Sequence, residues 1–271
     1  MGWRERARGL RRAGAGGTRA APPAKRAGAI RQFEVDDDEP MVALGMDDPA
    51  RALLIAFGGM KLSIGIPPFE FLNMTRELPV KRLFLRDLEQ AWYHRGVRGH
   101  GESLPALADD LHGLVERHHV SRLVLAGSSA GGYAVLVLGG LLGADVVLSF
   151  SPQTIIEPEA LAQMHDDRWD RYVQPLMRDG RLDRRWSDAR AVLGDVERRG
   201  ATRYEVFFDA TMELDRAHAE RLEGIPAVHL RRYTGGSHNL VRTLRDSGEL
   251  KQVLTSALVA DAEDGSRPLP A

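Results

Sequence analysis

The chain has no cysteine among its 271 residues. This absence excludes disulfide bonds, thiolate metal ligands and a cysteine nucleophile. It is also typical of proteins from a reducing compartment, so we expect a cytoplasmic protein. Long apolar runs are missing too, because glycines and an aspartate interrupt the longest one, at 133–150. A membrane span needs about 18 uninterrupted apolar residues, so we predict no membrane partner.

Acidic residues are scarce at the start of the chain. Residues 1–31 contain nine Lys or Arg, a single Glu and few large apolar side chains. Such a segment cannot bury enough apolar surface to offset the entropy lost on folding. We therefore predict a disordered basic tail over 1–38 and one domain over 39–271. We interpret the tail as passive and expect no nucleic-acid partner. An arm that binds nucleic acid or a membrane is the alternative, and it rests on this tail alone.

Strand-like and helical segments alternate along most of the remaining chain. This rhythm is typical of parallel strands joined by helical crossovers, in a sheet that helices cover on both faces. It predicts an α/β fold with buried strands at 53–57, 80–87, 121–127, 144–152, 203–209 and 227–233. Helices are predicted at 69–78, 104–119, 133–142 and 218–224, with one helix or a helix pair at 239–258.

Residues 152–203 interrupt this alternation. The segment is polar, charged and helix-prone, and it contains Trp169, Tyr172 and Trp186. We predict that it forms a helical lid inserted ahead of the strand at 203–209.

The sequence Gly127-Ser128-Ser129-Ala130-Gly131 stands between the third predicted strand and the helix after it. It matches G-x-S-x-G, a sharp strand–turn–helix whose central residue has a strained backbone. Glycine is needed two positions to either side, because larger side chains would clash with the strand and the helix. The helix N-terminus behind Ser129 offers the N–H of Ala130 to a developing oxyanion. We predict that Ser129 is a nucleophile, and an ordinary strand-to-helix turn is the alternative.

Taken in order, the phrases "FGGM", "GSSAGG" and "GGSH", separated by strands and a lid, resemble the α/β-hydrolase family over about residues 50–255. Longer phrases such as "RDLEQAWYH", "FSPQT" and "DRAHAERL" are similar to a bacterial branch of that family. Some members of that branch are found near glycan-building genes. The branch often has methionine where Ala130 stands, a change that keeps the backbone donor. The resemblance implies the α/β-hydrolase fold and serine chemistry, but it gives almost no information about the substrate.

In that family the acid and then the base follow the nucleophile along the chain. His238, after Gly235 and Gly236, fits a base that takes the serine proton and later returns it. The acid should follow the fifth strand, where the candidates are Asp209, Glu213 and Asp215. We prefer Asp209, at the strand end, with Asp215 close behind; Asp215 has an alternative role as a helix N-cap.

The family places a second oxyanion donor in the loop after the first core strand. "AFGGM" would supply it through the backbone N–H of Gly59, or of Met60 if the loop is shifted. The loop after the second strand contains Arg86, Trp92 and Tyr93. Aromatic side chains beside charges suit a sugar or another polar ligand, so we predict that these three residues bind substrate; packing against the lid is the alternative.

Neither a P-loop nor G-x-G-x-x-G occurs at the glycines, and the histidines lack a clustered acidic partner, so we predict no cofactor and no metal. The sequence thus predicts a serine hydrolase that acts on an ester, thioester or amide through a Ser-His-Asp triad and an acyl-enzyme. Carboxylic esters are the preferred substrates, and the acyl group would be carried by a small molecule or a glycan. An acyltransferase of the same fold and a non-catalytic binding module are the alternatives.

Overall fold

The computed structural model describes residues 39–60 and 70–259. A compact unit starts at Pro40. The disordered tail predicted for 1–38 lies outside the described residues. In the part of the chain that the structure does describe, no helix is both long and apolar enough to span a membrane.

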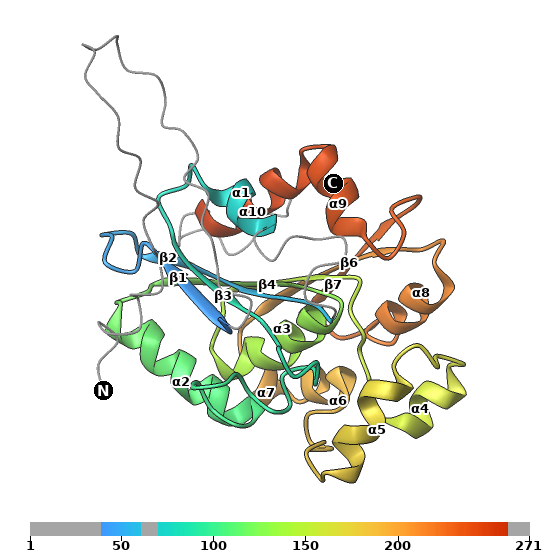
Figure 1. The fold of residues 1–271 in the computed structure, drawn as a ribbon. Coiled ribbons are helices and arrows are strands. Elements are labelled where there is room, and N and C mark those ends of the chain that lie inside the picture. The colour runs from blue at the N-terminus through green and yellow to red at the C-terminus, as the bar shows by residue number, and fades with distance from the viewer. Residues whose placement is uncertain (1–38, 61–69, 260–271) are drawn as a thin grey trace, which may run out of the picture. The chain divides into compact units, whose positions relative to one another are not determined.

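A sheet forms the centre of this unit (Figure 1). Among the described residues it has seven strands, in the order β1-β3-β2-β4-β5-β6-β7. All neighbouring strands run parallel except β1, which pairs antiparallel with β3. All six predicted strands are present, and β1 is an addition at the edge. Their bounds are β1 (Met41–Leu44), β2 (Ala52–Phe57), β3 (Lys81–Leu85), β4 (Arg122–Ser128), β5 (Val146–Phe150), β6 (Arg203–Asp209) and β7 (Val228–Tyr233).

Helices cover both faces of the sheet, as the alternation predicts. In β2, Leu53 and Ile55 face one apolar cluster, while Leu54 and Ala56 face the other, and all four are buried. A strand that is buried on both faces has apolar side chains at successive positions, so it forms one apolar run in the sequence. This is why β2 could be predicted. Helices α1 (Glu70–Thr75), α9 (Leu240–Asp246) and α10 (Glu249–Val259) lie on one face, with α2 (Leu104–Arg117), α3 (Ala130–Leu141), α6 (Ala189–Gly194) and α7 (Val196–Arg199) on the other (Figure 1).

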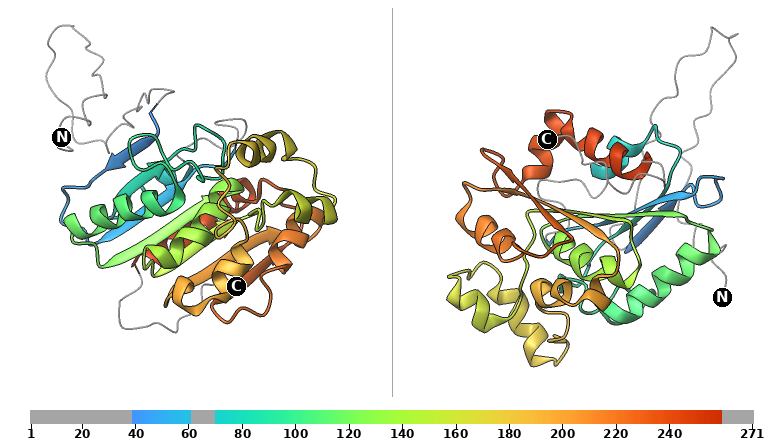
Figure 2. Two further views of the ribbon diagram at one scale, coloured as in Figure 1. Left: turned by 90° about the horizontal axis from the view of Figure 1, so that it is seen from below. Right: turned by 180° about the vertical axis from the view of Figure 1, so that it is seen from behind.

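The segment between β5 and β6 is helical, as predicted. Besides α6 and α7 it contains α4 (Pro158–Gln163) and α5 (Asp170–Arg178). Figures 1 and 2 show α4 and α5 set apart from the helices that lie along the sheet. Trp169 and Trp186 are buried, so the segment packs into the core. Its role as a lid stays a prediction.

The order of the strands creates a switch point beside β2. The chain passes from β2 to β3 on one side and then to β4 on the other side of β2. In open parallel sheets, ligands bind beyond the carboxyl ends of the strands at such a point. Phe57 ends β2 and Ser128 ends β4, so this edge is where a site is expected.

Candidate active site

The turn from β4 into α3 has the strained geometry that its sequence predicts. Ser129 has φ 56° and ψ −118°, a region that residues with a side chain rarely occupy. A Cβ on Gly127 would lie 2.3 Å from the carbonyl oxygen of Gly131, and one on Gly131 would lie 2.1 Å from that of Phe57. Both glycines are therefore required for strand, turn and helix to approach so closely.

Ser129, His238 and Asp215 form a hydrogen-bonded chain. His238 Nε2 lies 3.2 Å from Ser129 Oγ, and His238 Nδ1 lies 2.9 Å from both carboxylate oxygens of Asp215. An ionised carboxylate only accepts hydrogen bonds, so Nδ1 carries the proton and Nε2 is free to accept one from the serine. Asp215 is 2% exposed and His238 is 30% exposed, so the acid is shielded while the imidazole remains accessible.

The preference for Asp209 as the partner of His238 is therefore wrong in geometric terms. Asp209 accepts hydrogen bonds from the N–H of Ser237 at 2.6 Å and from the N–H and hydroxyl of Thr211. Burial works against its charged form, but these bonds outweigh burial and lower the pKa of Asp209. Asp209 thus fixes the turn that precedes His238.

Asp215 reaches the imidazole because of where α8 (Glu213–Glu220) begins. The sequence predicts a helix only from 218, but α8 starts five residues earlier and places Asp215 in its first turn. Met212 occupies the N-cap position, so the alternative role of Asp215 as an N-cap is also wrong. Glu213, the third candidate, is exposed.

The loop after β2 passes beside the turn at Ser129. A Cβ on Gly59 would lie 3.0 Å from the carbonyl oxygen of Ser128 and 3.5 Å from Ser129 Cβ. Ala130 is the first residue of α3, where backbone N–H groups have no acceptor within the helix. Met60 is 8% exposed and joins the apolar core. The loop after β2 and the N-terminus of α3 thus both lie next to Ser129.

The prediction that Arg86, Trp92 and Tyr93 bind substrate does not agree with their burial. The side chains of Trp92 and Tyr93 are fully buried, and Arg86 is 9% exposed. The Tyr93 hydroxyl donates to the carbonyl oxygen of Gly58 at 3.0 Å. That carbonyl belongs to the peptide whose N–H is that of Gly59, so this bond constrains the orientation of the peptide, although the hydroxyl also lies 3.2 Å from the carbonyl oxygen of Leu85. Trp92 and Tyr93 therefore belong to the buried core beside the site.

Gln153 is a site residue that sequence reasoning missed. Its side-chain amide lies beside Ser129 Oγ, at 3.2 Å from Nε2 and 3.4 Å from Oε1. The Trp92 indole N–H donates to Oε1 of the same amide at 3.2 Å. A polar residue shortly after the end of β5 is the only local signal that could have pointed to it.

A second carboxylate–imidazole pair lies close to the first. His218 Nε2 is 3.1 Å from Asp166, and the backbone N–H of Thr154 donates to His218 Nδ1 at 3.1 Å. Arg168 binds Asp166 through two hydrogen bonds of 2.7 Å and lies 3.6 Å from Asp215. Burial opposes the charged form of Asp166, but the bonds from Arg168 and His218 outweigh it and lower its pKa well below its usual value.

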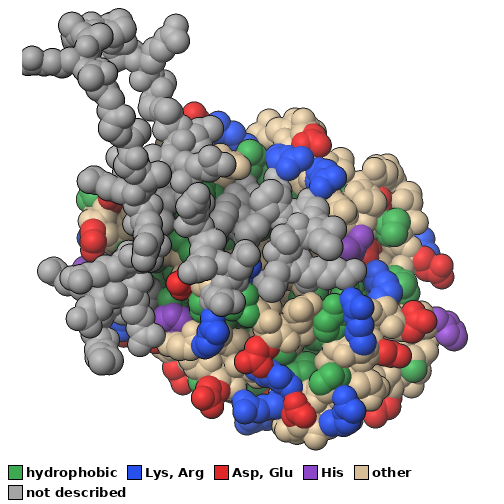
Figure 3. Space-filling view, in the orientation of Figure 1, with side chains coloured by type: hydrophobic (Ala, Val, Ile, Leu, Met, Phe, Trp, Pro, Cys, Tyr) green, Lys and Arg blue, Asp and Glu red, His purple; other side chains and the backbone are tan. Residues whose placement is uncertain are grey.

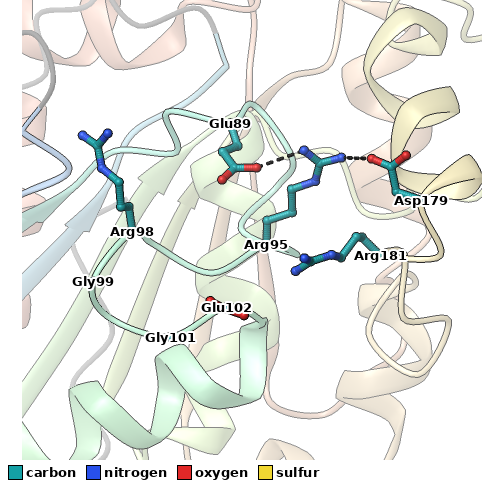
Figure 4. A pocket seen from close by; sticks show the side chains of 8 residues that line it. All are labelled: Glu89, Arg95, Arg98, Gly99, Gly101, Glu102, Asp179 and Arg181. Atoms are coloured by element: carbon teal, nitrogen blue, oxygen red, sulfur yellow. Dashed lines mark hydrogen bonds and ion pairs between the residues drawn. The ribbon is translucent and has the colours of Figure 1, made fainter.

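A cavity of about 740 Å³ opens between the loop after β3 and the end of α5 (Figure 4). Charged side chains line it, and Arg95 bridges its two sides by binding Glu89 at 2.9 Å and also Asp179. Neither Ser129 nor His238 is among its lining residues. The cavity is therefore a separate feature from the hydrogen-bonded chain at Ser129.

The described residues contain no cluster of potential metal ligands, and the described part of the face in Figure 3 carries charges of both signs. Among the described residues, no three His, Asp or Glu side chains are grouped so that they could hold a metal ion. Figure 3 shows Lys and Arg side chains beside Asp and Glu side chains on the described part of the visible face. That part of the surface therefore has no broad basic area.

Comparisons with known proteins support the fold. No model of a known protein family matches the sequence, and no curated protein matches it. An alpha/beta hydrolase enzyme from the metagenome of lagoon sediments at Mar Chica, Morocco, superposes with a TM-score of 0.52 at 12% identity. The alignment covers 80% of this chain and 94% of that one.

Two further solved structures have the same architecture. The capsule O-acetyltransferase of Neisseria meningitidis serogroup A has a TM-score of 0.53 at 13% identity, covering 80% of this chain and 92% of that one. A glycosylation associate protein complex from Streptococcus agalactiae gives 0.54 at 15% identity, covering 84% of this chain and 45% of that one. At such identities the likeness concerns the fold alone.

Proposed function

This chain has the α/β-hydrolase fold, and on that premise we propose that it is a serine hydrolase that cleaves an ester, thioester or amide through an acyl-enzyme. The observation that carries the proposal is the chain Ser129–His238–Asp215 at the carboxyl edge of the sheet. A strained serine, an imidazole with a free acceptor nitrogen and a shielded carboxylate have the arrangement that nucleophilic catalysis requires.

The first step is acylation of Ser129. Its Oγ attacks the substrate carbonyl carbon while its proton moves to His238 Nε2, which lies 3.2 Å away. Asp215 holds Nδ1–H and stabilises the imidazolium that forms. When the tetrahedral intermediate collapses, the bond to the leaving group breaks and the leaving group takes the proton from Nε2.

Backbone N–H groups stabilise the charge that develops on the carbonyl oxygen. Ala130 offers one from the start of α3, and Gly59, or Met60 one residue on, offers the other. Such fixed donors, aimed at the position of the oxyanion, often contribute the largest single share of the rate enhancement. A Gly59 without a side chain lets the acyl oxygen come close to the backbone.

Water completes the reaction in the second step. His238 removes a proton from water, which attacks the acyl carbon, and the bond to Ser129 Oγ then breaks as Oγ regains its proton. An alcohol can take the place of water, and one structural neighbour is a capsule O-acetyltransferase, so acyl transfer to a hydroxyl group is the second candidate. We propose an acyl group on a small molecule or a glycan as the substrate class.

The test is intact-mass spectrometry after incubation with a fluorophosphonate. We expect one adduct on the wild type and none on Ser129→Ala. Ser128→Ala is the matched control, because it removes the neighbouring hydroxyl, and it should be labelled like the wild type. A folded wild type that takes up no label would contradict the proposal and favour a non-catalytic binding module. Adding an alcohol during turnover of p-nitrophenyl acetate separates hydrolysis from transfer, since only a transferase yields mainly the new ester.

A further inference from the structure

Gln153 and His238 both lie within hydrogen-bond distance of the hydroxyl of the proposed nucleophile, Ser129. It follows β5, and its side chain is 1% exposed. Both atoms of its amide group are near Ser129 Oγ, with Nε2 the nearer at 3.2 Å. A buried amide costs free energy unless its groups are hydrogen-bonded, so its partners define its role.

Trp92 decides which way the amide points. An indole N–H can only donate, so the atom that it approaches at 3.2 Å must be the carbonyl oxygen of Gln153. The NH2 group then faces Ser129 and donates to Oγ. This leaves the serine proton directed at His238 Nε2 and one lone pair on Oγ available for attack.

The indole itself is held firmly. Trp92 is fully buried, and it makes edge-to-face contacts with Trp169 and Tyr172 at centroid distances of 6.0 and 6.5 Å. Its backbone has φ 48°, and the following residue, Tyr93, gives its N–H to Asp87 at 3.0 Å. A residue in this region of φ persists only where its surroundings hold it there.

We propose that Gln153 is a catalytic residue that donates a hydrogen bond to Ser129 Oγ, and that Trp92 is the positioning residue that orients its amide. The inference rests on the proposed function. In acylation, the bond from Gln153 fixes the rotamer of Ser129 while the Oγ–carbon bond forms and the proton passes to His238. In deacylation, the carbon–Oγ bond breaks, its electron pair returns to Oγ, and the Gln153 N–H stabilises that charge until His238 returns the proton.

The decisive variant is Gln153→Glu, which keeps the shape and the acceptor for Trp92 but replaces the donor with a carboxylate oxygen. The serine proton can then go to Glu in place of His238. We expect the rate of labelling of Ser129 by a fluorophosphonate to fall about tenfold, which corresponds to the loss of one hydrogen bond. Gln163→Glu, the same change at an exposed position in α4, is the matched control and should label at the wild-type rate.

Two more variants separate catalysis from structure. Gln153→Asn keeps an uncharged amide that is too short to reach both partners, and it should show a similar loss if the Glu variant does not fold. Trp92→Phe removes the indole N–H, lets the amide turn over and should slow labelling about threefold. In Gln153→Glu, adding Trp92→Phe should slow labelling no further, because no amide remains to be oriented.

The outcomes are distinguishable from those that test the hydrolase itself. If the wild type is labelled on Ser129 and folded Gln153→Glu and Gln153→Asn are labelled within twofold of it, the role of Gln153 is overturned while the hydrolase stands. If only the thermal midpoint falls, Gln153 is merely structural and the proposal is likewise overturned. An unlabelled wild type contradicts the proposed function and, with it, this inference.

Discussion

Two carboxylate–imidazole pairs lie close together in this molecule, and they differ in what the second ring nitrogen meets. His238 binds Asp215 through Nδ1 and presents Nε2 to the Ser129 hydroxyl. His218 binds Asp166 through Nε2, while its Nδ1 accepts the backbone N–H of Thr154. His238 can therefore take a proton from Ser129 through Nε2. His218 cannot act in this way, because the lone pair on its Nδ1 already accepts the N–H of Thr154.

Burial separates the pairs further. The side chain of His218 is 1% exposed, and burial lowers its pKa even though Asp166 acts in the opposite direction. His238 is 30% exposed, so substrate and water can reach it. A histidine beside a carboxylate is therefore a proton acceptor only where its other nitrogen is both free and accessible.

The two pairs are not independent, because α8 carries a member of each. Asp215 and His218 are three residues apart and lie on one buried face of this helix. Arg168, from the segment between β5 and β6, binds Asp166 and also lies 3.6 Å from Asp215. The buried pair thus ties that segment to the helix that holds the acid of the accessible pair.

The largest expected effect comes from Asp215→Asn. The amide can donate to Nδ1, which leaves the proton on Nε2, so His238 can no longer accept the serine proton. Activity on p-nitrophenyl acetate should fall about 10⁴-fold, as expected when a triad imidazole is held in the wrong tautomer. The measurement is kcat/KM for purified protein whose far-UV circular dichroism matches the wild type.

The same chemical change at the buried pair supplies the control for that experiment. Asp166→Asn should leave kcat/KM within about fivefold of the wild type. An equally large loss there would break the distinction between the two pairs and make Asp166 part of the catalytic machinery.

Asp166→Asn should instead reduce stability. In either orientation its NH2 group would face an N–H donor of Arg168, and in one of them it would also face the N–H that Thr154 keeps on His218 Nε2. Arg168 would also lose its counter-charge. We expect the free energy of unfolding in urea to fall by about 3 to 5 kcal/mol, as for other broken buried ion pairs.

The pH dependence of unfolding sharpens this prediction. The pKa of Asp166 is lower in the folded protein than in the unfolded chain, so its ionised form adds stability above the unfolded pKa, near pH 4. That stability is lost as pH falls through the folded pKa. Asp166→Asn should therefore flatten the stability curve below about pH 4, whereas an unchanged slope would show that Asp166 is not the group responsible.

Much of the fold could be predicted from the sequence because its signals are local. Strands such as β2 are buried on both faces, so each forms an apolar run that stands out between helices. The edge strand β1 was not predicted, because its four half-buried residues pair with β3, about forty residues further along the chain. No local pattern records that pairing.

The site divides in the same way. The position of Ser129 in a sharp turn could be predicted from the glycines around it, and that of His238 from its place after the last strand. Asp209 and Asp215 could not be separated, since the choice depends on where α8 begins. Gln153 could not be predicted as a site residue, because its contact with Trp92 forms only when folding brings the end of β5 to that side chain.

The smallest expected effect is that of Asp209→Asn, and it tests which carboxylate serves His238. The variant keeps an acceptor oxygen for either Thr211 or the N–H of Ser237, but it cannot serve both as the carboxylate does. The turn before His238 should loosen, and kcat/KM should fall about fivefold with His238 still bound to Asp215. A loss as large as that of Asp215→Asn would instead make Asp209 the working acid. In that case the hydrogen bond between Asp215 and His238 would not identify the catalytic pair, and Asp209 would have to be compared with Asp166 instead.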